Sequence, residues 1–388
     1  MERFFFHIAE GDEIKKGGVT DVYFLRDVKI LKELGINKRV KGEIRAASLP
    51  DEWDWAVFAG LEEATHLLEG LDVDVVAMEE GTLFGPEVPV LTIEGVYSEW
   101  ATYETSLLGF LCQASGIATR AARCKKAAGE RGVFSFGARR MHPAITPMIE
   151  RSAYVGGCDG VSATIGAELI EKPAIGTMPH ALILTIGDER QAFLAFDRIV
   201  EPEVKRVALV DTFNDEKFGA LIAAEALGEK LEAVRLDTPR SRRGNFLKIA
   251  QEVRWELDLR GFRNVKIFAS GGIDEWTIDE LNAVVDAYGV GGYISNAPMV
   301  DYSLDIVEVE GKPIAKRGKM SGAKQVWRCR DCGKTIVLPS KERPPDCCGL
   351  KPEGLLKDLL RSGKIVGELK KPQAIREKVL KQLEQVER

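Results

Sequence analysis

The sequence has little of several features that some classes of protein require. Its 388 residues include only four histidines, and no apolar run approaches the roughly 20 residues of a membrane-spanning helix. Acidic residues outnumber basic ones by 60 to 54, and the net charge of −6 argues against a general nucleic-acid binder. The N-terminal stretch MERFFFHIAEGDE lacks the basic start, apolar stretch and cleavage site of a signal peptide. We therefore expect a cytoplasmic enzyme that binds neither membranes nor nucleic acids.

The cysteine pattern argues against a disulfide framework. There are seven cysteines, an odd number, and four of them cluster late in the chain. In CRDCGKTIVLPSKERPPDCC, Cys329 and Cys332 form a Cys-x-x-Cys-Gly knuckle, which points two thiolates at one centre. Cys347 and Cys348 would complete a closed, structural Zn²⁺ site, although a second Cys-x-x-Cys is more usual than an adjacent pair. The alternative is four free thiols.

The length and a composition of 45% apolar and 29% charged residues predict a folded chain of two or three domains. The first domain is expected over residues 1–115, joined by 299–325, where Glu310 and Gly311 mark a hairpin. It should hold an amphipathic helix around TDVYFLRDVKILKEL, a run of short strands, and a long helix interrupted near Gly116. A charged and mainly helical tail is expected over 353–388.

From about residue 132 to 298, short β-rich runs alternate with amphipathic helices. The runs are GVFSFG, CDGVSAT, PAIGTM, RVALVDTF, EAVRLDT, NVKIFASGG and GGYISNAP, with helices expected over 215–227, 243–260 and 274–287. This alternation indicates parallel βαβ units in a barrel or an open α/β sheet. The barrel is favoured because polar residues end nearly every strand, where barrel active sites are built. These residues are Arg139, Thr164, Thr177, Asp211, Asp237, Ser270 and Asn296.

Two glycine pairs stand at the ends of the last two expected strands. They are Gly271–Gly272 in FASGGID and Gly291–Gly292 in YGVGGYISN. Free backbone N–H groups at such turns bind phosphate, and barrels commonly place a phosphate beside their final strands. Each pair taken alone could equally be an ordinary turn. Together they predict a phosphate site.

Other strand ends carry charged side chains. FSFGARRMHP brings Arg139 and Arg140 together, and guanidinium groups bind carboxylate or phosphate, although a solvated basic loop is the alternative. Asp211 in LVDTF and Asp237 in RLDT would hold ribose hydroxyls or Mg²⁺ on a diphosphate, or would cap helices. His180 in GTMPHALILTI is either a core histidine or a group placed for chemistry.

In their order along the chain, these stretches resemble nicotinate phosphoribosyltransferases. The shared stretches are TDVYF, FSFGARR, GTMPH, VDTF, RLDT, SGGID and GVGGYISN, with VEVEGKPIAKRGKMSG after the barrel. The helix TSLLGFLCQASGIATRAAR is also similar to one in quinolinate phosphoribosyltransferases, which share the fold. The resemblance covers about residues 10–325. The cysteine cluster resembles a zinc-knuckle appendage of some archaeal members.

The resemblance implies an α/β protein with an N-terminal α/β sandwich over 1–115. An incomplete (β/α) barrel over 116–298 would carry catalysis, and 326–388 would hold a zinc-binding knuckle and C-terminal helices. The family joins nicotinate to 5-phosphoribosyl 1-diphosphate, giving nicotinate mononucleotide and diphosphate in NAD biosynthesis. It uses Mg²⁺ with the diphosphate and ATP as a co-substrate. A neighbouring subunit completes each active site, which implies a homodimer or a higher homo-oligomer.

The resemblance also assigns residues. His180 matches the histidine that these enzymes phosphorylate from ATP, and Arg235 and Asp237 would flank the substrate and the ribose. Tyr23 would stack on the pyridine ring from the partner subunit, with Asp21 beside it. The remaining substrate-binding residues are Phe136 and Arg139 around nicotinate, Ser270, Gly271, Gly272, Gly291 and Gly292 around the 5-phosphate, and Thr177 and Asp211.

Two stretches depart from the family pattern. Ala181, Leu182 and Ile183 stand where many members have a bulkier acidic-aromatic sequence. Pro239 and three arginines in RLDTPRSRRGN replace a small, acidic continuation. Both stretches lie directly after a residue to which the resemblance assigns a role in catalysis.

Three other functions remain open. Quinolinate phosphoribosyltransferase would need a denser Lys/Arg pocket, because its substrate carries two carboxylates. A pocket for nicotinamide is argued against by Arg139, which suits a carboxylate. A catalytically idle barrel with a zinc-ribbon interaction module is the third, and the acidic composition and intact glycine and aspartate positions count against it.

Overall fold

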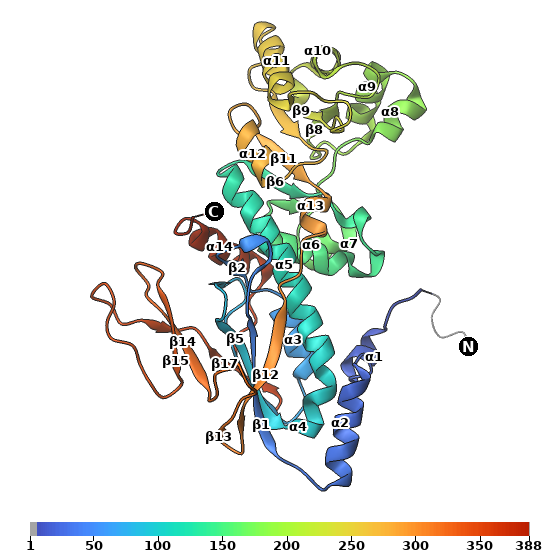
Figure 1. The fold of residues 1–388 in the computed structure, drawn as a ribbon. Helices are drawn as coiled ribbons and strands as arrows, with labels where there is room; N and C mark the ends of the chain where they lie inside the picture. Colours follow the sequence, from blue (N-terminus) through green and yellow to red (C-terminus); the bar gives the residue numbers. More distant parts are fainter. Residues whose placement is uncertain (1–5, 388) are drawn as a thin grey trace. The chain divides into compact units, whose positions relative to one another are not determined.

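A computed structural model describes residues 6–387 (Figure 1). The chain divides into two compact units. The first contains the residues up to Thr119 together with Pro298–Glu387, and the second contains Arg120–Ala297. Within the described residues, no helix has both the length and the apolar character needed to cross a membrane.

The first unit is built on a seven-stranded sheet in the order β13-β12-β1-β5-β3-β17-β18. Its strands are β1 (Arg39–Ala46), β3 (Val73–Ala77), β5 (Pro89–Val96), β12 (Tyr302–Val309), β13 (Lys312–Pro313), β17 (Lys357–Arg361) and β18 (Lys364–Ile365). The predicted hairpin is confirmed, because Glu310 and Gly311 both take positive φ between β12 and β13. Strands from both ends of the chain thus share one sheet.

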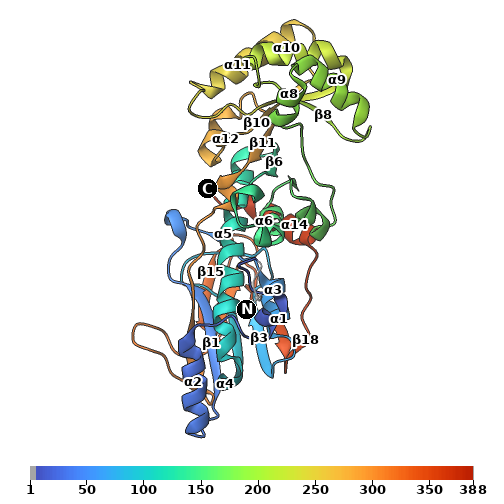
Figure 2. The same ribbon diagram turned by 90° about the vertical axis from the view of Figure 1, so that its right-hand side faces the viewer.

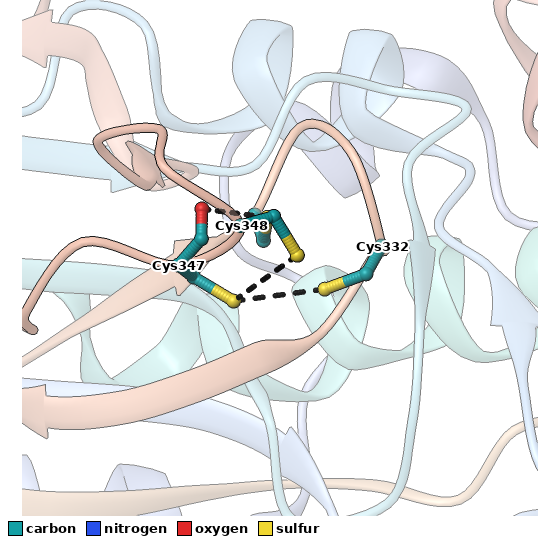
Figure 3. Close-up of side chains that lie close together, drawn as sticks. Cys332, Cys347 and Cys348 are labelled. Carbon is teal, nitrogen blue, oxygen red and sulfur yellow. Dashed lines mark hydrogen bonds between the residues drawn. The ribbon is translucent and has the colours of Figure 1, made fainter.

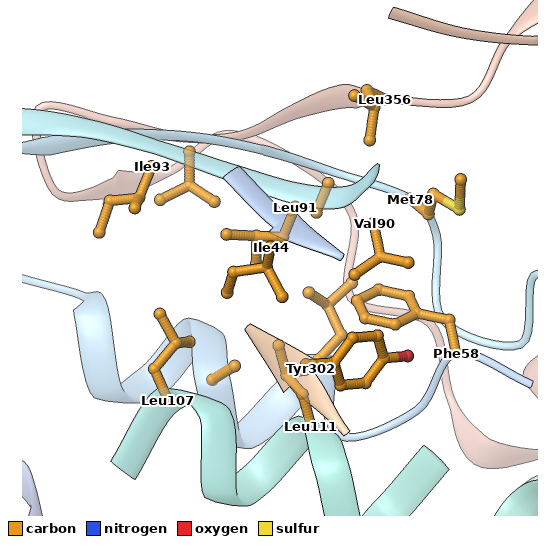
Figure 4. Close-up of a cluster of buried hydrophobic side chains, with 14 of the residues drawn as sticks. Ile44, Phe58, Met78, Val90, Leu91, Ile93, Leu107, Leu111, Tyr302 and Leu356 are labelled. Carbon is orange, nitrogen blue, oxygen red and sulfur yellow. The ribbon is translucent and has the colours of Figure 1, made fainter. Parts of the chain in front are cut away.

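Helices of the first unit supply the other half of its core. Their bounds are α1 (Gly11–Lys15), α2 (Val22–Glu33), α3 (Leu61–Leu68), α4 (Tyr97–Trp100) and α5 (Glu104–Ala128), the last of which continues into the second unit from Arg120. A two-stranded sheet joins β2 (Ala56–Val57) to β4 (Leu83–Phe84). Ile44 and Ile93 of the sheet and Leu107 and Leu111 of α5 are fully buried in one cluster (Figure 4). This burial fixes α5 along the sheet. The predicted mixed α/β first unit is confirmed.

The predicted interruption of the long helix near Gly116 is wrong. Helix α5 continues from Glu104 to Ala128. A Cβ at Gly116 would lie 2.2 Å from the carbonyl oxygen of Pro298, so glycine is needed there for close approach of another segment. Glycine costs a helix only about 1 kcal/mol relative to alanine, which a helix of this length tolerates when it is packed.

The tail is less helical than predicted. Its first half forms β16 (Glu353–Gly354), β17 and β18, and only α14 (Pro372–Leu383) is a helix. Pro372 begins that helix, at the position where a missing N–H costs nothing. Strand β17 replaces the expected helix because its buried leucines, Leu359 and Leu360, complete the sheet beside β3.

Glu79 ties the tail to the first unit. It accepts hydrogen bonds from Lys357 of β17 at 2.7 Å and from Lys378 of α14 at 3.0 Å. Burial would raise the pKa of Glu79, but these two lysines outweigh it and hold the pKa at about 2. Glu79 is therefore ionised at neutral pH and holds both tail elements.

The second unit is a six-stranded sheet in the order β7-β6-β11-β10-β9-β8. Every neighbouring pair is parallel, which confirms the predicted incomplete barrel. The strands are β6 (Gly132–Ser135), β7 (Gly160–Val161), β8 (Arg206–Leu209), β9 (Leu231–Leu236), β10 (Lys266–Ala269) and β11 (Ala287–Val290). The helices are α6 (Thr146–Val155), α7 (Thr164–Leu169), α8 (His180–Ile186), α9 (Glu189–Ile199), α10 (Glu216–Leu227), α11 (Phe246–Leu259), α12 (Glu275–Leu281) and α13 (Gly292–Ser295). Helices α8 to α11 gather around β8 and β9 (Figures 1 and 2).

Three predicted elements of this unit differ in the structure. PAIGTM is not a strand. Residues 173–179 are irregular, and a backbone hydrogen bond from the N–H of Ile175 to the carbonyl of Val161 ties them to β7. GGYISNAP is not a strand either, because the last strand ends at Val290 and α13 follows. The helix predicted over 274–287 ends at Leu281, because Ala287 already belongs to β11.

Candidate functional site

A cavity of about 380 Å³ opens at the carboxyl ends of the second unit's strands. Parallel strands all end at the same edge of a sheet, so the residues that follow them come together there. The lining residues are Phe136, Arg139, Arg140, Arg235, Asp237, Arg240, Ser270, Gly271, Gly272, Ile273, Asp274, Gly289, Gly291, Gly292 and Tyr293. Nine of the residues predicted from the sequence are in this set. Of the seven strand-end residues named from the sequence, three line this space, Arg139, Asp237 and Ser270, and four do not, namely Thr164, Thr177, Asp211 and Asn296.

Arg235 and Asp237 form the centre of the site. Arg235 points from β9, and its Nη2 donates to Asp237 Oδ2 at 3.0 Å while its Nη1 donates to Thr177 Oγ1. The other oxygen of Asp237 accepts from Ser270 Oγ at 2.7 Å. Thr177 and Ser270, from two other segments, thus hold the Arg235–Asp237 pair in place.

His180 belongs to the same network. Its Nε2 lies 3.3 Å from Asp211 Oδ1, and its Nδ1 lies 4.0 Å from Asp237 Oδ2. The second oxygen of Asp211 accepts from the N–H of Asp237 and from Thr238 Oγ1, both at 3.1 Å. Burial raises the pKa of Asp211, although the nearby His180 lowers it.

His180 is the first residue of α8. Its side chain is 38% exposed, whereas the side chain of Asp211 is 5% exposed. A core histidine would have both nitrogens tied to the protein and no open face. His180 instead lies against the carboxylates of Asp211 and Asp237 while part of its ring stays open to solvent. This geometry fits a group placed for chemistry.

The first glycine pair forms a tight turn after β10. Gly271 and Gly272 have φ of 82° and 70°, a region that side-chain-bearing residues rarely adopt. No hydrogen bond within the described residues uses the N–H of either glycine. Successive free N–H groups of this kind form an anion-binding concavity.

Phe136 and Arg139 follow β6 and also line the cavity. The Phe136 ring lies 5.8 Å from that of Phe268, and the guanidinium of Arg235 lies 5.9 Å from its centroid. Arg139 makes no ion pair within the described residues and is exposed. An aromatic ring and an unpaired arginine in the lining of one cavity suit a flat, anionic ligand.

Three charged or aromatic residues around the cavity were not predicted from the sequence, namely Arg240, Asp274 and Tyr293. Arg140 was predicted only together with Arg139, as a group that binds carboxylate or phosphate. Arg240 donates from Nη2 to Asp274 Oδ2 at 2.6 Å, and Asp274 also caps α12. The cluster of arginines in PRSRR was the available signal.

Asp21 and Tyr23 belong to the first unit. Asp21 directly precedes α2. Its carboxylate accepts a hydrogen bond from Thr105 Oγ1 at 2.9 Å, and its backbone N–H donates to Thr105 Oγ1 at 3.1 Å. Tyr23 is 52% exposed, and its ring lies 4.3 Å from that of Phe24. Thr105, at the start of α5, therefore positions the segment that presents Tyr23.

The four clustered cysteines form a possible metal centre in the first unit. Their sulfur atoms all lie within 4.8 Å of one another. Cys332 and Cys347 sulfurs are 3.6 Å apart, and Cys347 and Cys348 sulfurs are 3.9 Å apart (Figure 3). Tetrahedral zinc with Zn–S bonds of about 2.3 Å places its sulfurs about 3.8 Å apart. The thiol set fits that ion.

The adjacent pair reaches one centre because of local backbone geometry. Cys348 takes a positive φ of 53°, and Cys347 makes an isolated bridge with Leu350. The knuckle lies on a three-stranded sheet of β14 (Lys324–Arg328), β15 (Thr335–Pro339) and β16. Backbone N–H groups of Cys332 and Asp331 lower the pKa of Cys329 to about 7, which favours a thiolate.

Comparison with known proteins gives the family. The sequence-family model of the quinolinate phosphoribosyl transferase N-terminal domain matches residues 21–115 of this chain. The family model of the C-terminal domain matches residues 117–305. A Mycobacterium tuberculosis protein named nicotinate phosphoribosyltransferase pncB2 is 32% identical over 319 residues, covering 76% of this chain and 68% of the relative. The chain belongs to the nicotinate phosphoribosyltransferase family. A second protein of that organism, nicotinate phosphoribosyltransferase pncB1, is 32% identical over 291 residues, covering 70% of this chain.

The match to pncB1 spans only 63% of that relative's length. A solved structure is similar over nearly the whole chain. The crystal structure of nicotinate-nucleotide pyrophosphorylase from Pyrococcus furiosus is 58% identical, with a TM-score of 0.97 and 99% coverage of both chains. This nicotinate phosphoribosyltransferase family member therefore has a relative of the same architecture, tail included.

Proposed function

We propose that this protein joins nicotinate to 5-phosphoribosyl 1-diphosphate, forming nicotinate mononucleotide and diphosphate in NAD biosynthesis. One observation carries the proposal: a single cavity is lined by Phe136, Arg139, Arg235, Asp237 and two glycine turns. These groups match the ring, carboxylate, ribose and phosphate of the two substrates. The names of the Mycobacterium tuberculosis relatives support the same activity.

The reaction forms one bond and breaks one. The lone pair of the nicotinate ring nitrogen attacks C1 of the ribose, and diphosphate leaves with the electrons of the C1–O bond. Because the transition state resembles an oxocarbenium ion, positioning and charge neutralisation matter more than a strong nucleophile. In the proposal, Arg139 pairs with the nicotinate carboxylate and Asp237, held by Arg235 and Ser270, binds the ribose hydroxyls.

The diphosphate end would lie near the two aspartates of the network. Asp211 and Asp237 offer the carboxylate oxygens that Mg²⁺ uses together with waters and substrate phosphates, and the ion would neutralise charge on the diphosphate. Asp211 would hold the imidazole of His180, which would take the γ-phosphoryl group of ATP with release of ADP. Thr177 supports the arrangement by holding Arg235.

The proposal includes a second copy of the chain. Helix α2 leaves Val22, Tyr23 and Leu25 more than half exposed, and Ile30 and Leu34 as well. These apolar side chains have no cover within the described chain, and a large apolar patch of this kind marks an interaction site. The partner's barrel would bury it and receive Tyr23, giving shared active sites in a homodimer or a higher oligomer.

The knuckle would hold a structural Zn²⁺ through Cys329, Cys332, Cys347 and Cys348, leaving no open position for chemistry. We place this module outside the catalytic cycle. A cytoplasmic location also belongs to the proposal, since a cysteine cluster of metal-site type is usual in reducing compartments.

A steady-state assay with nicotinate, nicotinamide and quinolinate, each with and without ATP, tests the function. We expect turnover of nicotinate with 5-phosphoribosyl 1-diphosphate and an increased yield with ATP. The Arg139→Gln variant should raise the KM for nicotinate by about tenfold or more, since a charge-assisted pair is lost. Absence of nicotinate turnover would overturn the proposal.

A second candidate has one observation in its favour. The two matching domain models carry the name quinolinate phosphoribosyl transferase. Quinolinate has two carboxylates, and four arginines line the cavity. Release of CO₂ from quinolinate, without turnover of nicotinate, would establish this candidate in the same assay.

A further inference from the structure

Each glycine turn of the cavity has an arginine side chain lying along it. A Cβ added to Gly272 would lie 3.2 Å from Arg240 Nε, 3.4 Å from its Cγ and 3.5 Å from its Cδ. A Cβ added to Gly292 would lie 3.8 Å from Arg140 Cγ. The two turns follow β10 and β11, which are parallel neighbours. Arg140, which follows β6, and Arg240, which follows β9, therefore lie beside neighbouring glycine turns of the same cavity.

Arg240 is held in place while keeping donors available. Asp274 Oδ2 binds its Nη2 at 2.6 Å, and the other Asp274 oxygen caps α12 through Thr277. No hydrogen bond within the described residues uses Nε of Arg240, the atom that would lie closest to a Cβ added at Gly272. A guanidinium with five N–H donors can bind a carboxylate with one edge and an anion with the other.

The charges around the cavity do not balance. Four arginines and two aspartates line it, and each aspartate is already paired, Asp237 with Arg235 and Asp274 with Arg240. Arg243 adds a further cation close by, donating to the carbonyl of Gly271 at 2.7 Å. Uncompensated guanidinium groups beside free backbone N–H groups call for an anion of more than one charge.

We propose that Arg140 and Arg240 are phosphate-binding residues, each laid over one glycine turn, that together neutralise the phosphate monoester of the pentose substrate. This inference rests on the proposed function, which supplies a phosphorylated pentose. A phosphate monoester carries a charge of about −1.5 to −2 at pH 7 and three acceptor oxygens, which suits two guanidinium groups and the turn N–H donors. Arg139 then remains for the nicotinate carboxylate.

Titration calorimetry with ribose 5-phosphate on the full chain tests this inference without requiring turnover. The variants are Arg140→Gln and Arg240→Gln, with Arg242→Gln as a matched control, because Arg242 lies in the same loop but is exposed and does not line the cavity. Arg240→Lys keeps the charge without the planar fork. Melting temperatures confirm that each variant folds.

We expect Arg140→Gln and Arg240→Gln each to weaken ribose 5-phosphate binding by about tenfold, the loss of one charge-assisted contact. Arg242→Gln should bind as the wild type does, and Arg240→Lys should be intermediate. In turnover, the KM for 5-phosphoribosyl 1-diphosphate should rise while that for nicotinate stays within about twofold.

Two results would overturn the assignment: a wild-type protein that does not bind ribose 5-phosphate, or Gln variants at both positions that bind it as tightly as Arg242→Gln. A rise in the nicotinate KM alone would also overturn it, by assigning these arginines to the carboxylate. If the binding pattern is as expected but nicotinate is not a substrate, the phosphate site stands and the proposed function fails.

Discussion

At the scale of single residues, His180 carries the most specific part of the proposed chemistry. Its Nε2 faces a buried aspartate while one side of the ring stays open. In the proposed chemistry, Asp211 orients the imidazole through Nε2, and the other ring nitrogen would take the phosphoryl group. The apolar residues that follow it, a departure from the family pattern, form α8 and leave this geometry intact.

Replacing His180 with Ala should remove the effect of ATP. The ratio of turnover with ATP to turnover without it should fall to about 1, because no imidazole remains to accept the phosphoryl group. A steady-state assay at matched nicotinate concentrations measures this ratio. His66→Ala is the control, since His66 is an exposed histidine of α3 in the first unit. ATP stimulation that survives in His180→Ala would exclude the phosphohistidine.

Residue types at strand ends predicted much of the site. Asp237 and Ser270 were found because polar side chains after parallel strands converge at one edge, whereas Arg235, which lies within β9, was assigned by the family resemblance. Arg240 and Asp274 were not found, because their pairing joins two loops and depends on loop geometry that periodicity does not encode. The placement of His180 beside Asp211 likewise depends on the tertiary fold, because the two residues are 31 positions apart in the sequence.

At the scale of elements, the errors have a common cause. PAIGTM has the composition of a strand, but no neighbouring strand pairs with it, and an isolated run gains little from extended structure. The tail segment around Leu359 has helix-forming residues, but an open edge beside β3 offers backbone partners and burial. Tertiary context overrides local propensity in both cases.

The cysteine knuckle is the element whose prediction can be tested alone. Purified protein should contain about one zinc ion per chain, because four thiolates satisfy its tetrahedral preference. Cys332→Ser should lower that content to near zero, and Cys348→Ser should lower it if the adjacent pair ligates as proposed. Metal analysis by mass spectrometry measures the number of zinc ions per chain. Cys112→Ser is the control, since Cys112 lies in α5 away from the cluster. Equal zinc loss in the control would contradict the assignment.

At the scale of the whole molecule, the proposed sharing of active sites predicts complementation between inactive variants. Tyr23→Ala and Asp237→Ala should each be nearly inactive as pure oligomers. In a mixed dimer, one site would carry both changes and the other neither. Random mixing gives half mixed dimers, so coexpression should restore about a quarter of wild-type turnover. Tyr23→Ala mixed with Asp21→Ala should restore nothing, because both changes lie on the same donating segment. Equal activity in the two mixtures would show that each chain builds its site alone.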